Sequence, residues 1–291
     1  MLSAGHRDSL TAGRAGDADA AQIARIGPMG DVLVLCYHAI SERWPDELAV
    51  RPNRLRSQLE HTLDLGYVAT TFGRAVLDPP GPRTLAVTFD DGYRSVIELG
   101  LPVLRELGIP ATLFVPSAKI ATEAPMSWPG IDHWVGTAYG DELVGMSWEE
   151  TAALAEAGWE IGSHTRTHPH LTDLDEAALA NELAESRAEI ERRLGRPCRT
   201  IAYPYGDADE RVERATAVAG YEAAAALPTG RISSHPSPLM WPRLMVGRSE
   251  TDDDYRRHTS HAMRRLRASV AWTVVERAVP SAKAAIRRLR R

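Results

Sequence analysis

Short apolar runs alternate along the chain with longer segments of helical periodicity. Four runs have the length of a buried strand and lie near Gly, Pro or Asp: 32–37, 85–89, 111–115 and 200–203. Apolar residues recur every three or four positions in five further segments: 54–65, 95–107, 148–157, 175–194 and 208–219. This alternation predicts repeated βα units around a parallel sheet.

The positions of the polar motifs favour one sheet topology. DDGY follows the run that ends at Phe89, SHTRTHPHL follows the strand-like WEIG, and YPYGD follows TIA at 200–202. In a βα barrel, the loops after the strands converge on one face and build the site there. We therefore expect an α/β fold with a closed or partly closed βα barrel, rather than an open doubly wound sheet.

Asp90 and Asp91 stand side by side at the end of an apolar run, where like charges repel each other and lose solvation. His164 and His168 follow another strand end, so a single helical turn could aim both imidazoles at one point. With Asp91 as the third ligand, these side chains make a site for a divalent metal such as Zn²⁺, with positions left open for water. Asp90 is then free to act as general base.

Both signals also have plainer interpretations. Two His residues four apart often occur by accident. Capping of the helix after DDGY accounts for one Asp of the pair but leaves the second unexplained. We expect the remaining His residues, among them His133 and His170, to be solvated or structural.

Three segments, taken in order, resemble the motifs of the polysaccharide deacetylase family, also called the NodB-homology domain or carbohydrate esterase family 4: TFDDG at 88–92, SHTRTHPHL at 163–171 and AYPYG at 202–206. The resemblance implies a distorted (β/α) barrel and metal-dependent removal of N-acetyl groups from aminosugars, with an N-acetylated saccharide as substrate. Carried onto this sequence, it implies a general base and three metal ligands: Asp90, and then Asp91, His164 and His168. It also implies that the backbone N–H of Tyr205 helps to hold the oxyanion of the tetrahedral intermediate.

The general acid departs from the commonest family pattern. Many members carry a late LxH motif, which has no convincing match after residue 206. Instead, LCYHAI at 35–40 resembles the N-terminal Tyr-His segment of the branch that deacetylates poly-N-acetylglucosamine, which implies His38 as the acid. A hydrogen-bonded structural His is the alternative.

A second departure concerns an Arg that steadies the catalytic Asp in the family. Ala202 stands at its usual position. Arg243, in WPRLMV, could reach Asp90 from a later strand and form a charge-assisted hydrogen bond. A structural ion pair is the alternative.

A long insert at 117–147 carries Trp128, Trp134 and Tyr139. Long loops after barrel strands often bind substrate, and aromatic faces could stack on sugar rings there. The same residues could equally form a small core within the insert.

Composition and targeting signals narrow the class of protein. Hydrophobic residues at 44% and charged residues at 25% are ordinary globular values. Cys36 and Cys198 are too few for a disulfide framework or a cysteine metal cluster, so we expect free, buried thiols. The first 28 residues hold no apolar stretch typical of a signal peptide, which favours a cytoplasmic location. We expect a flexible leader at 1–28, the deacetylase domain at 29–255 and a basic helical tail at 256–291.

The tail differs in charge from the rest of the chain. Of the 34 Lys and Arg residues, 11 lie from Arg256 onward, against a single acidic residue. Within 262–278, an apolar helical stripe is flanked by Arg: Met263, Leu266, Val270 and Val274. Such a helix suits an anionic membrane surface and would place the protein at the inner membrane face. The alternative is a stripe packed on the barrel. We expect no nucleic-acid partner.

The expected function is metal-dependent hydrolysis of an N-acetyl group on an aminosugar of a glycan or a lipid-linked saccharide. One alternative keeps the fold but changes the bond: a deformylase, or a cyclic imide or ureide hydrolase. Another is a carbohydrate-binding pseudoenzyme. The complete set of Asp90 and three metal ligands argues against the pseudoenzyme, because a binding protein needs no unmetallated base.

Overall fold

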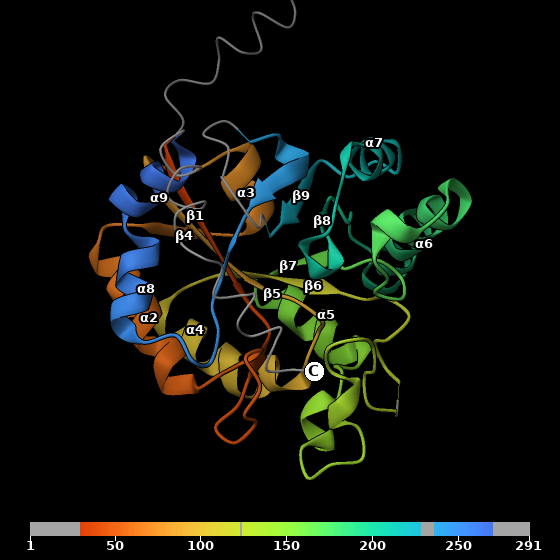
Figure 1. Ribbon diagram of the computed structural model, residues 1–291, viewed down its shortest axis with the longest axis horizontal. Helices are drawn as coiled ribbons and strands as arrows, with labels where there is room; N and C mark the ends of the chain where they lie inside the picture. The colour runs from red at the N-terminus through yellow and green to blue at the C-terminus, as the bar shows by residue number, and fades with distance from the viewer. Residues whose placement is uncertain (1–29, 123, 228–235, 270–291) are drawn as a thin grey trace, which may run out of the picture.

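The computed structural model describes residues 30–122, 124–227 and 236–269 (Figure 1). Its strands are β1 (Asp31–Tyr37), β2 (Ala39–Ile40), β3 (Ala49–Val50), β4 (Val68–Thr70), β5 (Arg83–Phe89), β6 (Ala111–Val115), β7 (Glu160–Ser163), β8 (Thr200–Ala202), β9 (Ala223–Ala226), β10 (Trp241–Pro242) and β11 (Leu244–Met245). Its α-helices are α2 (Pro52–Asp64), α3 (Phe72–Leu77), α4 (Leu101–Leu107), α5 (Trp148–Glu156), α6 (Glu176–Leu194), α7 (Glu210–Val218), α8 (Asp252–Thr259) and α9 (His261–Ala268). The strands and helices predicted from the sequence are all present, one of them in two parts.

Within the described ranges, a parallel sheet curls into a nearly closed barrel with helices around it (Figure 1). The strand order is β10, β9, β8, β7, β6, β5, β1, β11, and β4 pairs with the first half of β5. Strands β10 and β11 lie at opposite ends of this order, yet only Arg243 separates them in the chain. The chain itself therefore bridges the two edges of the sheet at Arg243. The predicted distorted (β/α) barrel is confirmed.

Alternate strand side chains face two hydrophobic layers. The inner layer joins small strand residues to helix α3 and contains Val34, Phe72, Ala75, Ala86, Phe114, Ala202, Ala223, Ala225 and Trp241. Helix α3 packs against β1, β5 and β9 and fills the end of the barrel at which the strands begin. The larger outer layer lies between the strands and the surrounding helices.

Strand β9 escaped the sequence patterns because it consists of four alanines, a residue that favours helices and is depleted in strands. Ala223 and Ala225 belong to the inner layer, where small side chains leave room for α3, while Ala224 and Ala226 belong to the outer layer. Packing on both faces thus outweighs the intrinsic preference of alanine.

The helix expected at 95–107 has two parts. A π-helical segment, Val96–Gly100, precedes α4. Pro102 stands in the first turn of α4, where its missing backbone N–H costs least, so the regular helix begins there.

The chain after β11 packs on the barrel through α8 and α9. Tyr255 of α8 is buried, and its hydroxyl lies 2.7 Å from Thr62 Oγ1. Arg264 of α9 pairs with Asp31 of β1 at 2.6 Å. Helix α8 continues across the boundary between residues 255 and 256, where we placed the start of the tail. At least the first part of the expected tail is therefore joined to the barrel.

Most of the expected membrane-binding stripe lies outside the described residues. Helix α9 ends at Ala268, and Val270 and Val274 belong to 270–291, which is not described; neither is the expected leader at 1–28. The membrane contact therefore stays a prediction. Across the part of the chain that is described, no helix is both long and apolar enough to cross a bilayer.

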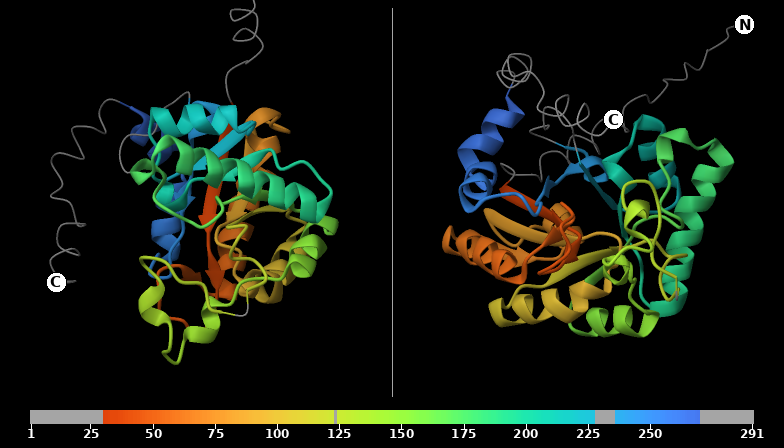
Figure 2. Two further views of the ribbon diagram at one scale, coloured as in Figure 1. Left: turned by 90° about the vertical axis from the view of Figure 1, so that its right-hand side faces the viewer. Right: turned by 60° about the horizontal axis from the view of Figure 1, so that its bottom comes forward.

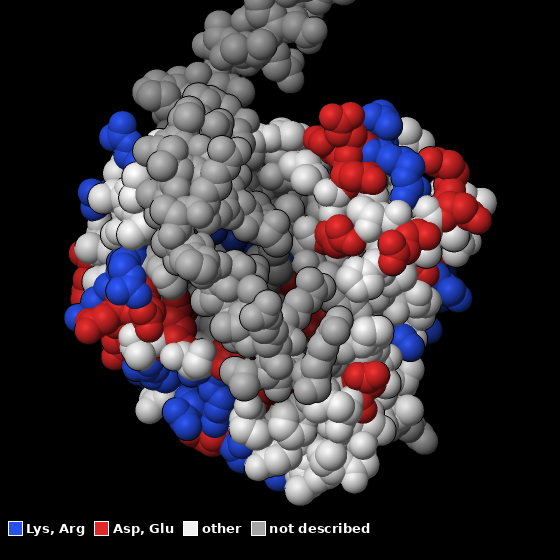
Figure 3. Space-filling view, viewed as in Figure 1, with Lys and Arg blue, Asp and Glu red and all other residues white. Residues whose placement is uncertain are grey.

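Acidic side chains gather over α6 and α7 on the face shown in Figure 3, with basic side chains between them. Several pair along or between these helices, as Arg193 does with Glu189 at 2.8 Å. This mixture is typical of solvated helix surfaces.

Glu160, at the start of β7, forms hydrogen bonds to several elements at the end of the barrel where the strands begin. Its Oε2 accepts hydrogen bonds from Gly73 N of α3 at 2.8 Å and from Thr112 Oγ1 of β6 at 2.9 Å. Its Oε1 accepts one from Thr200 Oγ1 of β8 at 2.9 Å. One carboxylate thus joins three strands to the helix that fills the barrel.

Glu160→Ala should lower the free energy of unfolding by about 1–3 kcal/mol, because it leaves the buried donors of Gly73, Thr112 and Thr200 without an acceptor. Urea denaturation followed by circular dichroism measures the change. The matched control is Glu185→Ala on the exposed side of α6, which should stay within about 0.5 kcal/mol of wild type. Equal stability of the two variants would contradict this role for Glu160.

Candidate metal and catalytic site

The site residues predicted from the sequence meet where the strands end. His38 follows β1, Asp90 and Asp91 follow β5, His164 and His168 follow β7, Tyr205 follows β8, and Arg243 lies between β10 and β11. All except Arg243 line one cleft of about 750 Å³. The insert at 117–147, yellow-green at the bottom of the left view in Figure 2, adds Trp128 and Trp134 to the cleft wall.

Asp91, His164 and His168 converge on one point. Asp91 Oδ1 lies 3.4 Å from His164 Nε2 and 3.3 Å from His168 Nε2. All three side chains are buried, and Asp91 Oδ1 has no hydrogen-bond partner among the described residues. Burial by itself would raise the pKa of Asp91, but the two facing imidazoles lower that pKa well below its ordinary value.

The tautomer of His164 leaves its Nε2 facing Asp91, a geometry that fits a positive charge between them. His164 Nδ1 lies 2.8 Å from the carbonyl oxygen of Ala202, which can only accept, so Nδ1 carries the proton. In the neutral ring, Nε2 then presents a bare lone pair toward the carboxylate oxygen of Asp91. Two lone pairs aimed at each other in a buried site are unfavourable without a positive charge between them. Either a proton on His164 or a metal ion supplies that charge: burial lowers the pKa of His164, but the carboxylates of Asp90 and Asp91 outweigh burial and raise it. Two imidazole nitrogens and one carboxylate oxygen suit a divalent metal such as Zn²⁺.

The two imidazoles are brought together by a loop, and the helical turn expected from their spacing is wrong. Thr165 and His168 have φ angles of 65° and 67°, in the left-handed region that a right-handed helix excludes. His168 N donates to Thr165 Oγ1 at 3.1 Å. The capping interpretation of the Asp pair also fails, because the segment Val96–Gly100 after DDGY has no side-chain cap.

Asp90 is bound to Arg243 by two parallel hydrogen bonds. Arg243 Nη1 donates to Oδ1 and Nη2 to Oδ2, both at 2.7 Å. Burial raises the pKa of Asp90, but the charge of Arg243, followed by that of His164, outweighs it and lowers the pKa to about 2. The contact expected from the sequence between these distant residues is therefore present, and Asp90 is ionised at neutral pH.

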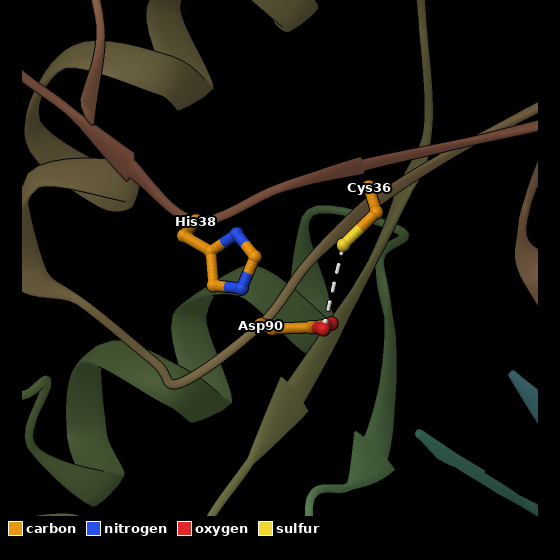
Figure 4. Close-up of side chains that lie close together, drawn as sticks. All are labelled: Cys36, His38 and Asp90. Carbon is orange, nitrogen blue, oxygen red and sulfur yellow. Dashed lines mark hydrogen bonds between the residues drawn. The ribbon is translucent and has the colours of Figure 1, made fainter. Parts of the chain in front are cut away.

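Cys36 and His38, on one side of β1, lie beside Asp90 (Figure 4). Cys36 Sγ donates to Asp90 Oδ2 at 3.4 Å. A His38 ring nitrogen, Cys36 Sγ and an Asp90 oxygen lie within 4.8 Å of one another. This second group suits a metal poorly, because Arg243 already occupies both Asp90 oxygens with a positive charge, and burial raises the pKa of Cys36 well above its ordinary value.

His38 lies at the cleft wall with little exposure, 8% of its surface. Its Nδ1 is buried without a hydrogen-bond partner among the described residues. Burial lowers the pKa of His38, while the carboxylates of Asp91 and Asp90 act in the opposite direction.

Tyr205 turns the backbone sharply at the cleft. It has φ 58° and ψ 2°, and Gly206 follows with φ 70°. A Cβ at Gly206 would lie 2.4 Å from Leu227 Cβ, so the turn requires glycine there. The Tyr205 ring meets His168 edge-on, with centroids 4.7 Å apart.

The aromatic residues of the insert make different contacts. Trp134 donates Nε1–H to Asp46 Oδ2 at 2.8 Å, and Tyr139 meets its ring edge-on, so both contribute to packing within and beneath the insert. Trp128 instead stacks on His168, with ring centroids 4.4 Å apart. His133, expected to be solvated or structural, lines the cleft.

Two contacts were missed from the sequence. Cys36 stands two residues before His38, a spacing that places both side chains on one face of a strand, and this was the available signal for its position beside the site. The stacking of Trp128 on His168 had no such signal, because the insert lacks periodicity.

Comparisons with known proteins show the family to which this fold belongs. A family model described as polysaccharide deacetylase matches residues 78–224. A putative polysaccharide deacetylase of Bacillus subtilis, YxkH, is 26% identical over 194 residues, which cover 65% of this chain and 62% of the relative. A poly-beta-1,6-N-acetyl-D-glucosamine N-deacetylase of Staphylococcus aureus is 25% identical over 133 residues, covering 43% of this chain and 41% of the relative. The chain thus spans less than two thirds of the length of these curated relatives.

Solved structures support the same fold. The crystal structure of a polysaccharide deacetylase from Bacillus cereus aligns with a TM-score of 0.64 at 23% identity and covers 79% of this chain and 69% of that one. IcaB from Ammonifex degensii aligns with a TM-score of 0.60 at 24% identity and covers 80% and 97%. At these identities, the alignments establish the barrel fold.

Arg243→Met should lower the free energy of unfolding of the chelator-treated protein by about 3–5 kcal/mol, because Asp90 is left buried and unpaired. Adding Asp90→Asn should restore a large part of that loss, since the double variant holds no unpaired charge. Denaturant titration of both variants measures the difference. Arg199→Met, which breaks an exposed pair with Glu222, is the control and should change little. A double variant as unstable as Arg243→Met would show that the ion pair is not the cause.

Proposed function

The chain belongs to the polysaccharide deacetylase family, and on that premise we propose that it hydrolyses the N-acetyl amide of an aminosugar in a glycan or a lipid-linked saccharide, with a divalent metal, Zn²⁺ foremost, as cofactor. One observation carries the proposal. Three possible metal ligands, Asp91, His164 and His168, converge on one point, and a second carboxylate, Asp90, lies beside them without being part of that ligand group. A ligand set with a separate base is what amide hydrolysis needs.

Asp91, His164 and His168 would hold the metal through Oδ1 and the two Nε2 atoms. When bound there, a divalent cation supplies polarisation of the amide carbonyl and a lower pKa for the attacking water. The protein's part is to keep these three side chains buried and aimed at one point before substrate arrives.

Asp90 is the proposed general base. Its two oxygens offer about four acceptor positions, and three of them take hydrogen bonds, two from Arg243 and one from Cys36. The remaining position is available for the proton of the attacking water. The lowered pKa of Asp90 keeps the carboxylate ionised, and thus able to accept that proton, at neutral pH.

His38 and Tyr205 are proposed for the later steps. The tetrahedral intermediate carries a negative oxygen, toward which the backbone N–H of Tyr205 would donate. His38, at the end of β1 and on the cleft wall, would give a proton to the departing amine.

The cleft walls argue against an anionic saccharide as substrate. The lining residues that the structure describes include Trp134, Tyr205 and Met245 but no Lys or Arg. Anionic saccharides are usually bound by such basic side chains. The Staphylococcus aureus relative is named for deacetylation of poly-beta-1,6-N-acetyl-D-glucosamine, a saccharide of the same neutral, N-acetylated chemistry.

The first test of function is acetate release from N-acetylglucosamine oligosaccharides and lipid-linked saccharides, with and without chelator. Wild type should release acetate and stop when the metal is removed. Asp90→Asn should keep the metal but lose roughly 10² to 10⁴ in kcat, the usual cost of losing a general base, whereas Asp91→Asn and His164→Ala should lose the metal. N-formyl sugars, cyclic imides and ureides complete the panel. Turnover of only one of these other substrates would refute the assignment of an N-acetyl amide as substrate. Full activity of Asp90→Asn would refute the assignment of Asp90 as general base.

The pH profile of kcat/KM tests His38. A proton donor must be protonated, so activity should fall as the pH rises through the pKa of His38, which burial places below its ordinary value of 6.5. His38→Ala should lower kcat by roughly 10² to 10⁴, keep the metal and lose this alkaline limb. His258→Ala, half-exposed and paired with Glu250, is the control and should keep both kcat and the limb. An unchanged limb in His38→Ala would move the role elsewhere.

A further inference from the structure

The two histidines that face Asp91 are held in different ways. His164 donates its Nδ1–H to the carbonyl oxygen of Ala202. His168 Nδ1 is buried and has no hydrogen-bond partner in the part of the chain that the structure describes. An imidazole that binds a metal is usually oriented by a hydrogen bond from its other nitrogen. Another contact must therefore set the direction of the His168 ring.

Aromatic rings enclose the His168 imidazole. Trp128 stacks on one face, with centroids 4.4 Å apart and an angle of 23° between the planes. Tyr205 and His164 meet it edge-on, at 4.7 Å and 4.8 Å. Rotation of the imidazole about its Cβ–Cγ bond would drive its edge into the indole face, so the stack fixes the ring plane.

Trp128 is itself firmly placed. Only 7% of its surface is exposed, and its carbonyl oxygen accepts from Ile131 N at 3.1 Å. Nearby, Met126 N donates to Leu143 O at 2.9 Å, which joins the two limbs of the insert. The indole is thus supported by its own backbone turn and by the opposite limb of the insert.

We propose that Trp128 is a positioning residue for the metal: the face of its indole holds the His168 imidazole with Nε2 aimed at Asp91, in place of the hydrogen bond that orients His164. Bonding to a cation withdraws electrons from the imidazole and strengthens its attraction to the electron-rich indole face, so the stack favours the metal-bound ring. The insert then serves the metal site as well as the cleft wall. This inference rests on the proposed metal site.

The test compares Zn²⁺ affinity, measured by competition with a chromogenic chelator, among variants of Trp128. Trp128→Leu keeps apolar bulk but has no aromatic face, and it should weaken Zn²⁺ binding by roughly 10- to 100-fold, as for loss of other groups that orient a metal ligand. Trp128→Phe keeps a face and should bind more tightly than Trp128→Leu. The visible spectrum of the Co²⁺-loaded protein should change in Trp128→Leu and be largely restored in Trp128→Phe, a readout that depends on ligand geometry.

Trp134→Leu is the matched control, because Trp134 lies in the same insert and bonds Asp46 but does not stack on His168. It should keep the wild-type Zn²⁺ affinity. Thermal unfolding of each metal-free variant establishes that it is folded, and Trp128→Met replaces Trp128→Leu if the latter does not fold.

Three results would overturn the inference: wild-type affinity and Co²⁺ spectrum in Trp128→Leu, equal losses in Trp128→Leu and Trp134→Leu, or Trp128→Phe as weak as Trp128→Leu. In these cases wild type still binds metal and the proposed function stands. Absence of Zn²⁺ binding by wild type would instead remove the metal site and this inference together.

Discussion

Asp90 and Asp91 are consecutive residues, both ionised, with only 1% and 2% of their surfaces exposed. Burial of one such carboxylate costs several kcal/mol unless a positive group lies against it, and two neighbours also repel each other. If one cation lay between the two carboxylates, both would serve only as its ligands. The structure separates them instead: Arg243 pairs with Asp90, and two imidazoles face Asp91. The difference in partners is what allows adjacent carboxylates to act as base and ligand.

Arg243 links this electrostatic demand to closure of the barrel. Strands β10 and β11 have two residues each, and β11 meets β1 at only two positions. Few backbone hydrogen bonds therefore hold β11 against β1, where the sheet closes. The Arg243 guanidinium crosses this closure to Asp90 and Thr88 of the β5 region, at 2.7 Å and 3.0 Å. The group that stabilises the proposed base thus also fastens the last strands to the centre of the sheet.

The sequence allowed prediction where a residue's position follows from periodicity or from adjacency to a strand end. Strands β1, β5, β6, β7 and β8, and Asp91 beside His164 and His168, were found this way. The reach of Arg243 to Asp90 was expected from the family resemblance instead. Strand β9 was not, because packing against α3 selects alanine against its own preference. The loop that carries His168 was expected to be helical, since residue spacing gives no sign of a left-handed φ.

Contacts made by irregular segments form a further class that sequence patterns do not reach. Trp128 lies 40 residues from His168 in an insert without periodicity, and its stacking depends on the path of every turn between them. The same holds for backbone geometry. Of five described non-glycine residues with positive φ, four are at the site: Asp91, Thr165, His168 and Tyr205. Each such residue costs on the order of 1–3 kcal/mol and persists only when its surroundings fix it.

Helix α6 supplies much of that support for the loop after β7. Glu182 accepts hydrogen bonds from Arg166 N and Thr167 N at 2.9 Å and 2.8 Å, and Ser186 Oγ donates to Thr165 O at 2.9 Å. The outer helix therefore holds the loop backbone in its left-handed conformation, while aromatic rings within the cleft enclose the His168 imidazole. Hydrogen bonds from α6 and stacking within the cleft thus both restrain the loop that carries His168. The loop would lose little conformational entropy when a cation binds, and this preorganisation favours affinity for the cation.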